Sequence, residues 1–305
     1  MDYQSILDVC RSQFEADAAR TASVGGSGTL ALDKRGGIGF PEALTCVCND
    51  RILRFEEVST PFGDVPMVKL FAVNGQPVVR IPMHGWRLPV ATLEHTQATF
   101  WLLDQLGVHQ VIVDASVGGI GAKPMDVVIP DDVYNHEPAK IAMAKLAFEL
   151  GRDPWVRMYQ PFCPRLRSKL VTSVRQVKTE GHELGDLVDG GVYWTTPLGP
   201  FETAFEIATF KTLGATIVGQ SSGQEALAAR ILGMCLAVAN PVVNFAEGLN
   251  NAGWSGDKGM DSMYEAISMP MALMVYYTLE RIVSQTRTCD CQTIAHSPDL
   301  AGLTS

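Results

Sequence analysis

Val-Ile-Val-Asp-Ala-Ser-Val-Gly-Gly-Ile at residues 111–120 carries an apolar strand into a Gly-rich turn, and Ala-Thr-Ile-Val-Gly-Gln-Ser-Ser-Gly at residues 215–223 repeats this pattern. A Phe-Glu-Thr segment at residues 201–203 lies just ahead of the second strand. In an open α/β sheet, the carboxyl ends of the strands face the ligand. We therefore expect the turns at residues 116–119 and 219–223 to lie beside one pocket.

Helices and strands alternate around both turns. A helix predicted over Ala91–Leu106 ends at Gly107 and leads into a strand over Val108–Val113. Further downstream a helix, strand, helix and strand are predicted over Phe201–Leu213, Ala215–Val218, Gln224–Leu232 and Met234–Phe245. These strands are apolar on both faces, as buried parallel strands are. The alternation predicts an α/β fold.

Two local signals refine this interpretation. Short β-type runs over Met67–Val73 and Pro77–Ile81 are separated by Asn74-Gly75, a sequence typical of a tight hairpin turn. The last long helix, near Met263–Val283, contains Pro270, where we expect it to kink or to begin anew.

The chain divides into three regions. Residues 1–35 are predicted to be an N-terminal helical extension, because apolar residues near its start recur at helical spacing. Residues 36–283 are predicted to form one domain, since no linker or internal repeat interrupts them. Residues 284–305 are expected to be a flexible tail.

Composition and charge exclude several classes of protein. The chain has 305 residues, 47% of them apolar, which is enough for a large core. Its formal net charge of −9 comes without a basic stripe, which disfavours a nucleic-acid partner and favours a small metabolite. The first residues show neither the basic nor the apolar region that is typical of a signal peptide, and no apolar run of about 18 residues occurs. We expect a cytoplasmic protein without a membrane partner.

The seven cysteines do not resemble a secreted disulfide framework. They include two Cys-x-Cys pairs, Cys46/Cys48 and Cys289/Cys291, which raise the possibility of a zinc site or a redox pair. The usual metal spacing, however, is Cys-x-x-Cys. We therefore expect reduced thiols and no metal site, with the first pair in a strand and the second in the mobile tail.

Seven short motifs follow one another in an order that indicates a family. They are Thr60-Pro61-Phe62-Gly63, His84-Gly85, Val117-Gly118-Gly119, Val128-Ile129-Pro130-Asp131, Pro161-Phe162-Cys163-Pro164, Gly199-Pro200-Phe201-Glu202-Thr203 and Gly219-Gln220-Ser221-Ser222. With these motifs the chain resembles, over residues 36–283, the trimeric purine nucleoside phosphorylase and methylthioadenosine phosphorylase family.

This resemblance implies a single α/β domain with a mixed, partly barrel-like central sheet flanked by helices. It also implies a homotrimer with active sites near the subunit interfaces. The family reaction is phosphorolysis, in which a nucleoside and phosphate give a free base and a pentose 1-phosphate. Phosphate is then a co-substrate, and no further cofactor is expected.

The resemblance assigns Asn244 and Glu202 to the base, which needs hydrogen-bonding partners as negative charge develops on it. An Asn at this position contacts N7 and O6 in 6-oxopurine members, whereas adenine-selective members place Asp there and again two residues on. Here those positions hold Asn244 and Ala246, so a 6-oxopurine is favoured over adenine. Further residues expected along the base and sugar pockets are Phe201, Gln220, Val117 and Gly118.

On the phosphate side, the family's N-terminal hydroxyl loop is aligned with residues 36–39, where Ile38 has no hydroxyl. Residues 25–28 keep a hydroxyl, but they lie far upstream and no strand is predicted before them. The family's Thr or Asn in the middle turn is Ala115 here, next to Ser116. The expected phosphate contacts are Gly37, His84, Ser116 and Ser221.

The family's Arg-His pair is reduced to Met83-His84, so the phosphate arginine is missing. Arg87 and Arg35 are the candidate substitutes. Glu225 is interpreted as a structural carboxylate at the start of its helix.

Two alternatives stay open on these residues. If water replaced phosphate, the protein would be a nucleoside hydrolase, and Asp114, unusual in an apolar strand, could act as its base. The third possibility is a nucleoside-binding protein without catalysis.

Overall fold

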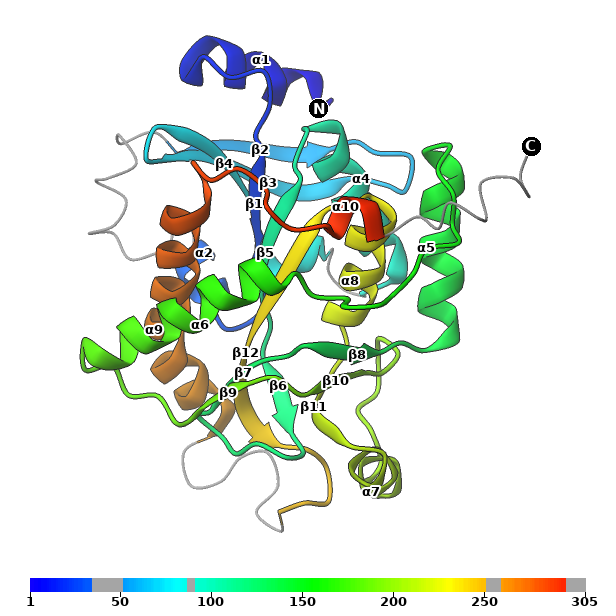
Figure 1. The fold of residues 1–305 in the computed structure, drawn as a ribbon, viewed down its shortest axis with the longest axis vertical. Coiled ribbons are helices and arrows are strands. Elements are labelled where there is room, and N and C mark those ends of the chain that lie inside the picture. The colour runs from blue at the N-terminus through cyan, green and yellow to red at the C-terminus, as the bar shows by residue number, and fades with distance from the viewer. Residues whose placement is uncertain (35–51, 87–90, 251–258, 295–305) are drawn as a thin grey trace.

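The computed structural model describes residues 1–34, 52–86, 91–250 and 259–294. Figure 1 shows the arrangement of the elements. The strands are β1 (Thr21–Val24), β2 (Leu53–Val58), β3 (Val65–Val73), β4 (Gln76–Ile81), β5 (Gln110–Asp114), β6 (Val117–Gly119), β7 (Val127–Ile129), β8 (Asp132–Tyr134), β9 (Leu187–Asp189), β10 (Val192–Thr195), β11 (Ala215–Gly219) and β12 (Cys235–Phe245).

The helices alternate with these strands over most of the chain. They are α1 (Gln4–Phe14), α2 (Leu30–Lys34), the 3-10 turn η2 (Pro82–Gly85), α4 (Leu93–Gln105), α5 (Glu137–Glu149), α6 (Pro164–Thr179), α7 (Ala204–Thr212), α8 (Ser222–Ile231), α9 (Gly259–Ile282) and α10 (Cys291–Ile294).

The strands of these ranges form a mixed sheet in the order β2-β3-β4-β1-β5-β12-β6-β11-β10-β8, with β7 paired to β12 and β9 paired to β7. The long strand β12 is central because it pairs in parallel with β5 along its first half and with β6 along its second. This confirms the predicted α/β domain with a mixed sheet flanked by helices.

Helices cover both faces of the sheet. Val111 and Val113 of β5 pack with α4, α5 and α8, whereas Ile112 of the same strand packs with α6 and α9. Alternate side chains of a strand point to opposite faces, so a strand buried on both sides must be apolar throughout. The continuous apolar runs of β5 and β12 therefore follow from their place between two helical layers (Figure 1).

The N-terminal region differs from the prediction. Thr21–Val24 form strand β1, which lies inside the sheet and pairs in parallel with both β4 and β5. Residues 1–35 are therefore not a purely helical extension, although α1 is helical as expected. The strand escaped prediction because two of its four residues are polar, Thr21 and Ser23, and both are buried.

Two further expectations need correction. The helix α9 does not begin anew at Pro270 but continues through it, and its buried face, which includes Ile267 and Met271, packs in the core against the sheet. Residues 291–294 form α10, and Cys291 is buried in the same core. The chain is thus packed beyond residue 284, while residues 295–305 lie outside the described ranges. None of the helices in the described part of the chain combines the length and apolarity needed to cross a membrane.

Candidate active site

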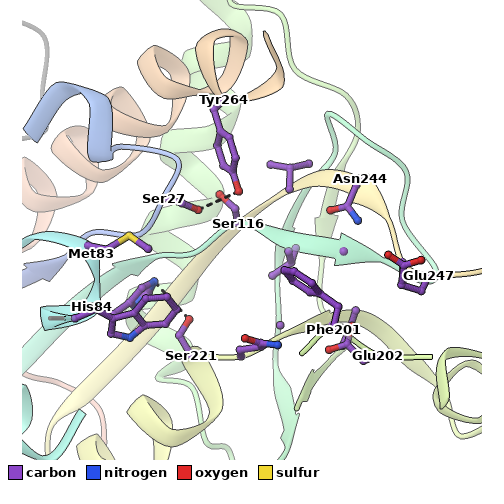
Figure 2. A pocket seen from close by; sticks show the side chains of 18 residues that line it. Ser27, Met83, His84, Ser116, Phe201, Glu202, Ser221, Asn244, Glu247 and Tyr264 are labelled. Atoms are coloured by element: carbon purple, nitrogen blue, oxygen red, sulfur yellow. Dashed lines mark hydrogen bonds between the residues drawn. The ribbon is translucent and has the colours of Figure 1, made fainter. Parts of the chain in front are cut away.

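A cavity of about 270 Å³ opens where β5, β6, β11 and β12 end. Ser116, Val117 and Gly118 line it from the first Gly-rich turn, and Gly219, Gln220 and Ser221 line it from the second. The predicted convergence of the two turns is therefore confirmed. Figure 2 shows the lining side chains in two groups, with His84 and Ser221 at one end and Asn244, Glu247, Phe201 and Glu202 at the other.

One end of the cavity gathers groups that suit an anion. We call this set the anion corner; it comprises Ser27, His84, Ser116 and Ser221, and all four line the cavity. The Ser116 hydroxyl is buried and has no hydrogen-bond partner among the described residues. A buried hydroxyl without a protein partner is costly, so it indicates a place for a ligand atom.

His84 is held in an unusual backbone conformation. Met83 and His84 have φ of 46° and 53°, in the left-handed region that non-glycine residues rarely adopt. The ring Nδ1 lies 2.8 Å from Glu225 Oε1, and Nε2 lies 3.4 Å from Ser221 Oγ. Backbone strain of this kind concentrates at functional sites, where surrounding contacts hold it in place.

The charge of His84 is set by its buried partner. Burial by itself lowers the pKa of His84, but the carboxylate of Glu225 more than offsets this, and the pKa is raised above its usual value. Glu225 therefore favours the protonated form of His84 and, with it, a positive charge in the anion corner. Glu225 was interpreted only as a structural carboxylate at the start of its helix; its partner is His84.

The segment 25–28 brings a serine hydroxyl to the cavity. Strand β1 ends directly before it, and His84 N donates to Gly25 O at 2.8 Å. A Cβ at Gly26 would lie 2.9 Å from His84 Nε2 and 2.5 Å from the Asp114 carbonyl oxygen, so only glycine permits this approach. Ser27 consequently reaches the cavity, where its Oγ donates to Tyr264 Oη at 3.2 Å. Gly37 lies outside the described residues.

The other end of the cavity holds the residues expected to bind the base. Glu202 accepts a hydrogen bond from Thr196 Oγ1, which orients its carboxylate. Asn244, at the end of β12, and Phe201 line the same cavity. Gln220 also lines it, and its amide donates to Gly199 O at 3.3 Å, so it ties the Phe-Glu-Thr segment to the second turn.

Asp114 does not face the cavity. Its carboxylate accepts from Gly26 N at 2.9 Å and from Thr29 Oγ1 at 2.8 Å, and it lies 3.5 Å from Arg80 Nη1. Burial raises its pKa, against the opposing charge of Arg80. Asp114 therefore holds the loop that carries Ser27, and the hypothesis that it is a base for water is corrected.

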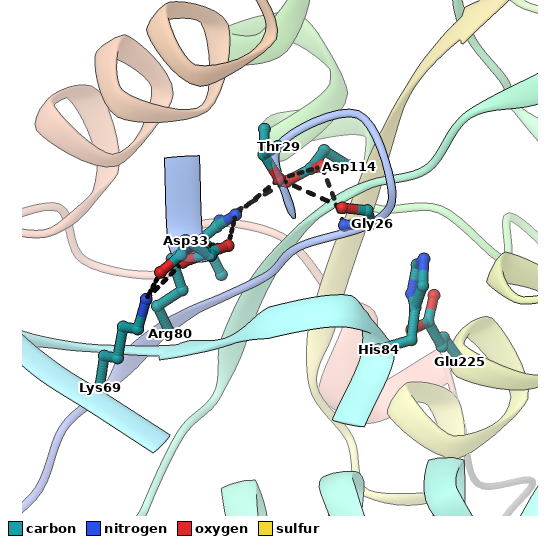
Figure 3. A network of polar contacts seen from close by, with 9 residues as sticks. Gly26, Thr29, Asp33, Lys69, Arg80, His84, Asp114 and Glu225 are labelled. Carbon is teal, nitrogen blue, oxygen red and sulfur yellow. Dashed lines mark hydrogen bonds and ion pairs between the residues drawn. The ribbon is translucent and has the colours of Figure 1, made fainter. Parts of the chain in front are cut away.

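This loop rests on a buried network of charged side chains (Figure 3). Asp33 contacts Lys69 Nζ at 2.8 Å and Arg80 Nη2 at 2.9 Å. Arg80 also donates to Thr29 Oγ1 at 2.7 Å. Buried charges are tolerated when each is paired and hydrogen-bonded, so the network fixes the loop without reaching the ligand.

The source of further positive charge is not among these residues. No lysine or arginine lines the cavity within the described part of the chain, and both candidate substitutes, Arg35 and Arg87, lie outside it. Tyr264 and Glu247 line the cavity and were not predicted, Ser27 was set aside, and Glu225, which orients His84, was given only a structural role. The Gly-Gly-Ser-Gly run was the available signal for Ser27.

Comparison with known proteins agrees with this geometry. A model of the phosphorylase superfamily matches residues 39–277. The probable S-methyl-5'-thioinosine phosphorylase of Methanothermobacter thermautotrophicus is 32% identical over 219 residues, which cover 70% of this chain and 72% of its own length. The 6-oxopurine nucleoside phosphorylase of Pyrococcus furiosus is 27% identical over 250 residues, which cover 78% of this chain and 89% of its own.

The fold is also similar to that of a solved structure. A methylthioadenosine phosphorylase from an antarctic soil metagenomic library superimposes with a TM-score of 0.70 and covers 92% of each chain. Its sequence identity is 20%, so this likeness concerns the architecture of the chain and not its substrate.

Proposed function

The chain belongs to the phosphorylase superfamily, and on that premise we propose that it cleaves the N-glycosidic bond of a 6-oxopurine nucleoside by phosphorolysis. One observation carries this proposal: the anion corner and the pair Glu202 and Asn244 line the same cavity from opposite ends. A nucleoside between them places its glycosidic bond between a bound phosphate and a bound base.

The base end suits a departing 6-oxopurine. Negative charge grows on the base as the glycosidic bond breaks, so hydrogen bonds to the base strengthen in the transition state. Asn244 presents an amide whose Nδ2 can donate to N7 or to O6, and the Glu202 carboxylate can accept from N1–H. The half-buried position of both side chains leaves them room to meet a ligand.

The anion corner suits inorganic phosphate as the nucleophile. His84 supplies positive charge, and the hydroxyls of Ser27, Ser116 and Ser221 supply donors. Helix α8 begins at Ser222, so its N-terminal dipole also favours an anion beside Ser221. Hydroxyl and imidazolium donors replace part of the missing arginine contact.

Relatives support phosphorolysis of 6-oxopurines over the two alternatives. Their names specify 6-oxopurine nucleosides and S-methyl-5'-thioinosine, and hypoxanthine is a 6-oxopurine. The hydrolase alternative loses its proposed base because Asp114 is engaged with Gly26, Thr29 and Arg80. Phosphate is a co-substrate in this proposal, and no other cofactor is required.

The proposal includes a homotrimer and a cytoplasmic location. Several aromatic side chains are exposed, among them Phe201 at the base end, Phe205 at 81% exposure, and Tyr134, which stacks on the half-buried Trp194. Exposed apolar patches of this kind support a subunit interface beside the site. The described cysteines are free thiols, in keeping with a reducing compartment.

A base-release assay tests the proposed reaction. The protein is incubated with inosine, guanosine, adenosine and their 5'-methylthio forms, with and without phosphate, and free base and pentose 1-phosphate are measured. We expect release of hypoxanthine or guanine only with phosphate. Equal release without phosphate contradicts phosphorolysis, and ligand-induced thermal stabilisation without release favours a binding protein. Light scattering of the same preparation tests the trimer.

A further inference from the structure

Four cysteines from distant parts of the chain meet at the start of β12. The Sγ atoms of Cys163, Cys235, Cys289 and Cys291 all lie within 4.8 Å of one another. Cys163, Cys235 and Cys291 are buried, and Cys289 is half-buried. We call these four residues the thiol cluster.

The backbone holds each side of the cluster in place. Cys163 caps the start of α6, and its N donates to Leu236 O at 2.8 Å. Cys235 is the first residue of β12, and its N donates to His109 O at 2.9 Å. The C-terminal pair reaches them because α10 begins at Cys291, beside the first residues of β12 (Figure 1).

The spacing of the sulfurs suits one small ion. A tetrahedron with metal–sulfur distances of 2.3 Å has sulfur–sulfur edges of about 3.8 Å. The cluster brackets this length, since all its sulfurs lie within 4.8 Å of one another and Cys235 Sγ lies 3.2 Å from Cys289 Sγ, in contact without a covalent bond. Four soft thiolates in a closed, tetrahedral arrangement are typical of structural zinc.

We propose that the thiol cluster is a structural site for one zinc ion, bound by Cys163, Cys235, Cys289 and Cys291. Binding displaces the four thiol protons to solvent and forms four Zn–S bonds, with no change in oxidation state. The sequence argument against metal rested on Cys-x-Cys spacing within one pair. The fold instead draws the other two ligands from positions 163 and 235, while Cys46 and Cys48 lie outside the described residues.

The surroundings suit the charge of such a site. Four thiolates around a divalent ion leave a net charge of about −2. Arg230 is buried beside the cluster, and its guanidinium donates to Cys291 O at 3.4 Å and to Tyr159 O at 3.2 Å. A buried cation beside the cluster thus offsets part of that charge.

The site would fasten the C-terminal segment to the sheet. Cys235 and Asn244 stand at opposite ends of β12, about 30 Å apart along an extended strand. The zinc ion therefore stabilises the fold far from the cavity and takes no part in the proposed reaction. Its presence can be tested whether or not the protein is a phosphorylase.

Metal content and thiol content of the wild-type chain give the first test. The full chain is expressed with added zinc and purified under reducing conditions without chelator; zinc is measured by mass spectrometry and thiols by titration in denaturant with chelator. We expect about one zinc per chain and all seven thiols. A metal-free protein overturns the proposal, whether it keeps all seven thiols or has lost two or four of them to disulfides.

Cobalt and two serine variants locate the ion. Replacement of zinc by Co²⁺ should produce the thiolate charge-transfer band and strong visible bands of a tetrahedral site. Cys289→Ser, at the half-buried position, should lose these bands and most of the zinc, whereas Cys10→Ser, a buried thiol of α1 outside the cluster, should keep both. Equal zinc in the two variants refutes the assignment. If Cys289→Ser does not fold, the wild-type stoichiometry and cobalt spectrum decide.

Discussion

The Nδ1 atom of His84 lies 2.8 Å from the Glu225 carboxylate, although 141 residues separate the two in the chain. The other ring nitrogen faces Ser221 and the cavity. Glu225 thus fixes the ring orientation and stabilises its charged form. In this way a helix-start carboxylate outside the cavity controls a charge inside it.

Replacing this carboxylate should change the pH dependence of phosphate use. The pKa of His84 is raised, so the imidazolium and its ion pair persist below the ordinary histidine pKa and are lost as pH rises through the raised value. In Glu225→Gln this loss occurs at lower pH. We expect the alkaline limb of kcat/KM for phosphate to move to lower pH, with a higher KM for phosphate at neutral pH. Glu183→Gln, an exposed change, should leave the profile in place; an unmoved limb in Glu225→Gln contradicts the assigned pair.

Base selectivity should depend on Glu202. A hydrogen bond to a charged group contributes about 1.5–3 kcal/mol, or roughly a 10- to 100-fold change in rate constant. Glu202→Gln should reduce kcat/KM for inosine by that factor and affect adenosine less, because adenosine has no N1–H to donate. Steady-state kinetics on both nucleosides measure the difference. Equal losses of kcat/KM on the two substrates would show that the Glu202 carboxylate does not distinguish the two bases.

The close approach of the Ser27 loop to His84 should not tolerate a methyl group. In Gly26→Ala the added Cβ would lie 2.5 Å from the Asp114 carbonyl oxygen and 2.9 Å from His84 Nε2. Overpacking of this kind costs about 1–3 kcal/mol, and the displaced loop should raise the KM for phosphate more than the KM for the nucleoside. Gly121→Ala is the matched control, since its Cβ would meet its nearest atom at 3.7 Å. Unchanged phosphate kinetics in Gly26→Ala would place the anion elsewhere.

The buried charge network should matter for stability. Asp33→Asn leaves Lys69 without its carboxylate partner, and breaking a buried ion pair costs about 3–5 kcal/mol. The pKa of Asp33 is lowered because Arg80 and Lys69 outweigh the effect of burial. Its contribution is therefore present above the ordinary carboxyl pKa and disappears as pH falls through the lowered value. Urea unfolding at several pH values measures this.

An exposed ion pair provides the comparison for that experiment. Asp186 pairs with Lys123 at 3.1 Å, with 74% and 61% of the two side chains exposed. Asp186→Asn should change the free energy of unfolding little, because solvent screens such pairs. If Asp33→Asn were no more destabilising than Asp186→Asn, the network would not support the loop.

Much of the sheet was predictable from local pattern. β5, β11 and β12 are apolar runs between helices. The sequence predicts them as strands because side chains on both their faces are buried and therefore apolar. The hairpin at Asn74-Gly75 was also predictable, because both residues adopt a positive φ, which Asn and Gly tolerate best. β1 was not, because its polar side chains are satisfied by partners far along the chain: Ser23 by Arg80 and Thr21 by Gln110.

The residues of the cavity also divide into those that sequence motifs predicted and those that only the structure revealed. Glu202, Asn244, His84, Ser116 and Ser221 were named from motifs, and all five line it. Asp114 was misjudged because a buried carboxylate in a strand can serve a loop as well as a ligand. The thiol cluster escaped because spacing within one Cys-x-Cys pair says nothing about thiols at positions 163 and 235.

The sequence by itself determined the alternation of helices and strands, the two Gly-rich turns, and the family to which the chain belongs. Those features depend on periodicity and on turn chemistry, which act between near neighbours. Only the tertiary structure decided that Glu225 contacts the imidazole of His84, that residues 25–28 bring a hydroxyl to the cavity, and that four cysteines lie together. These relationships join residues far apart in the chain, and burial makes each depend on a partner that only folding brings within reach.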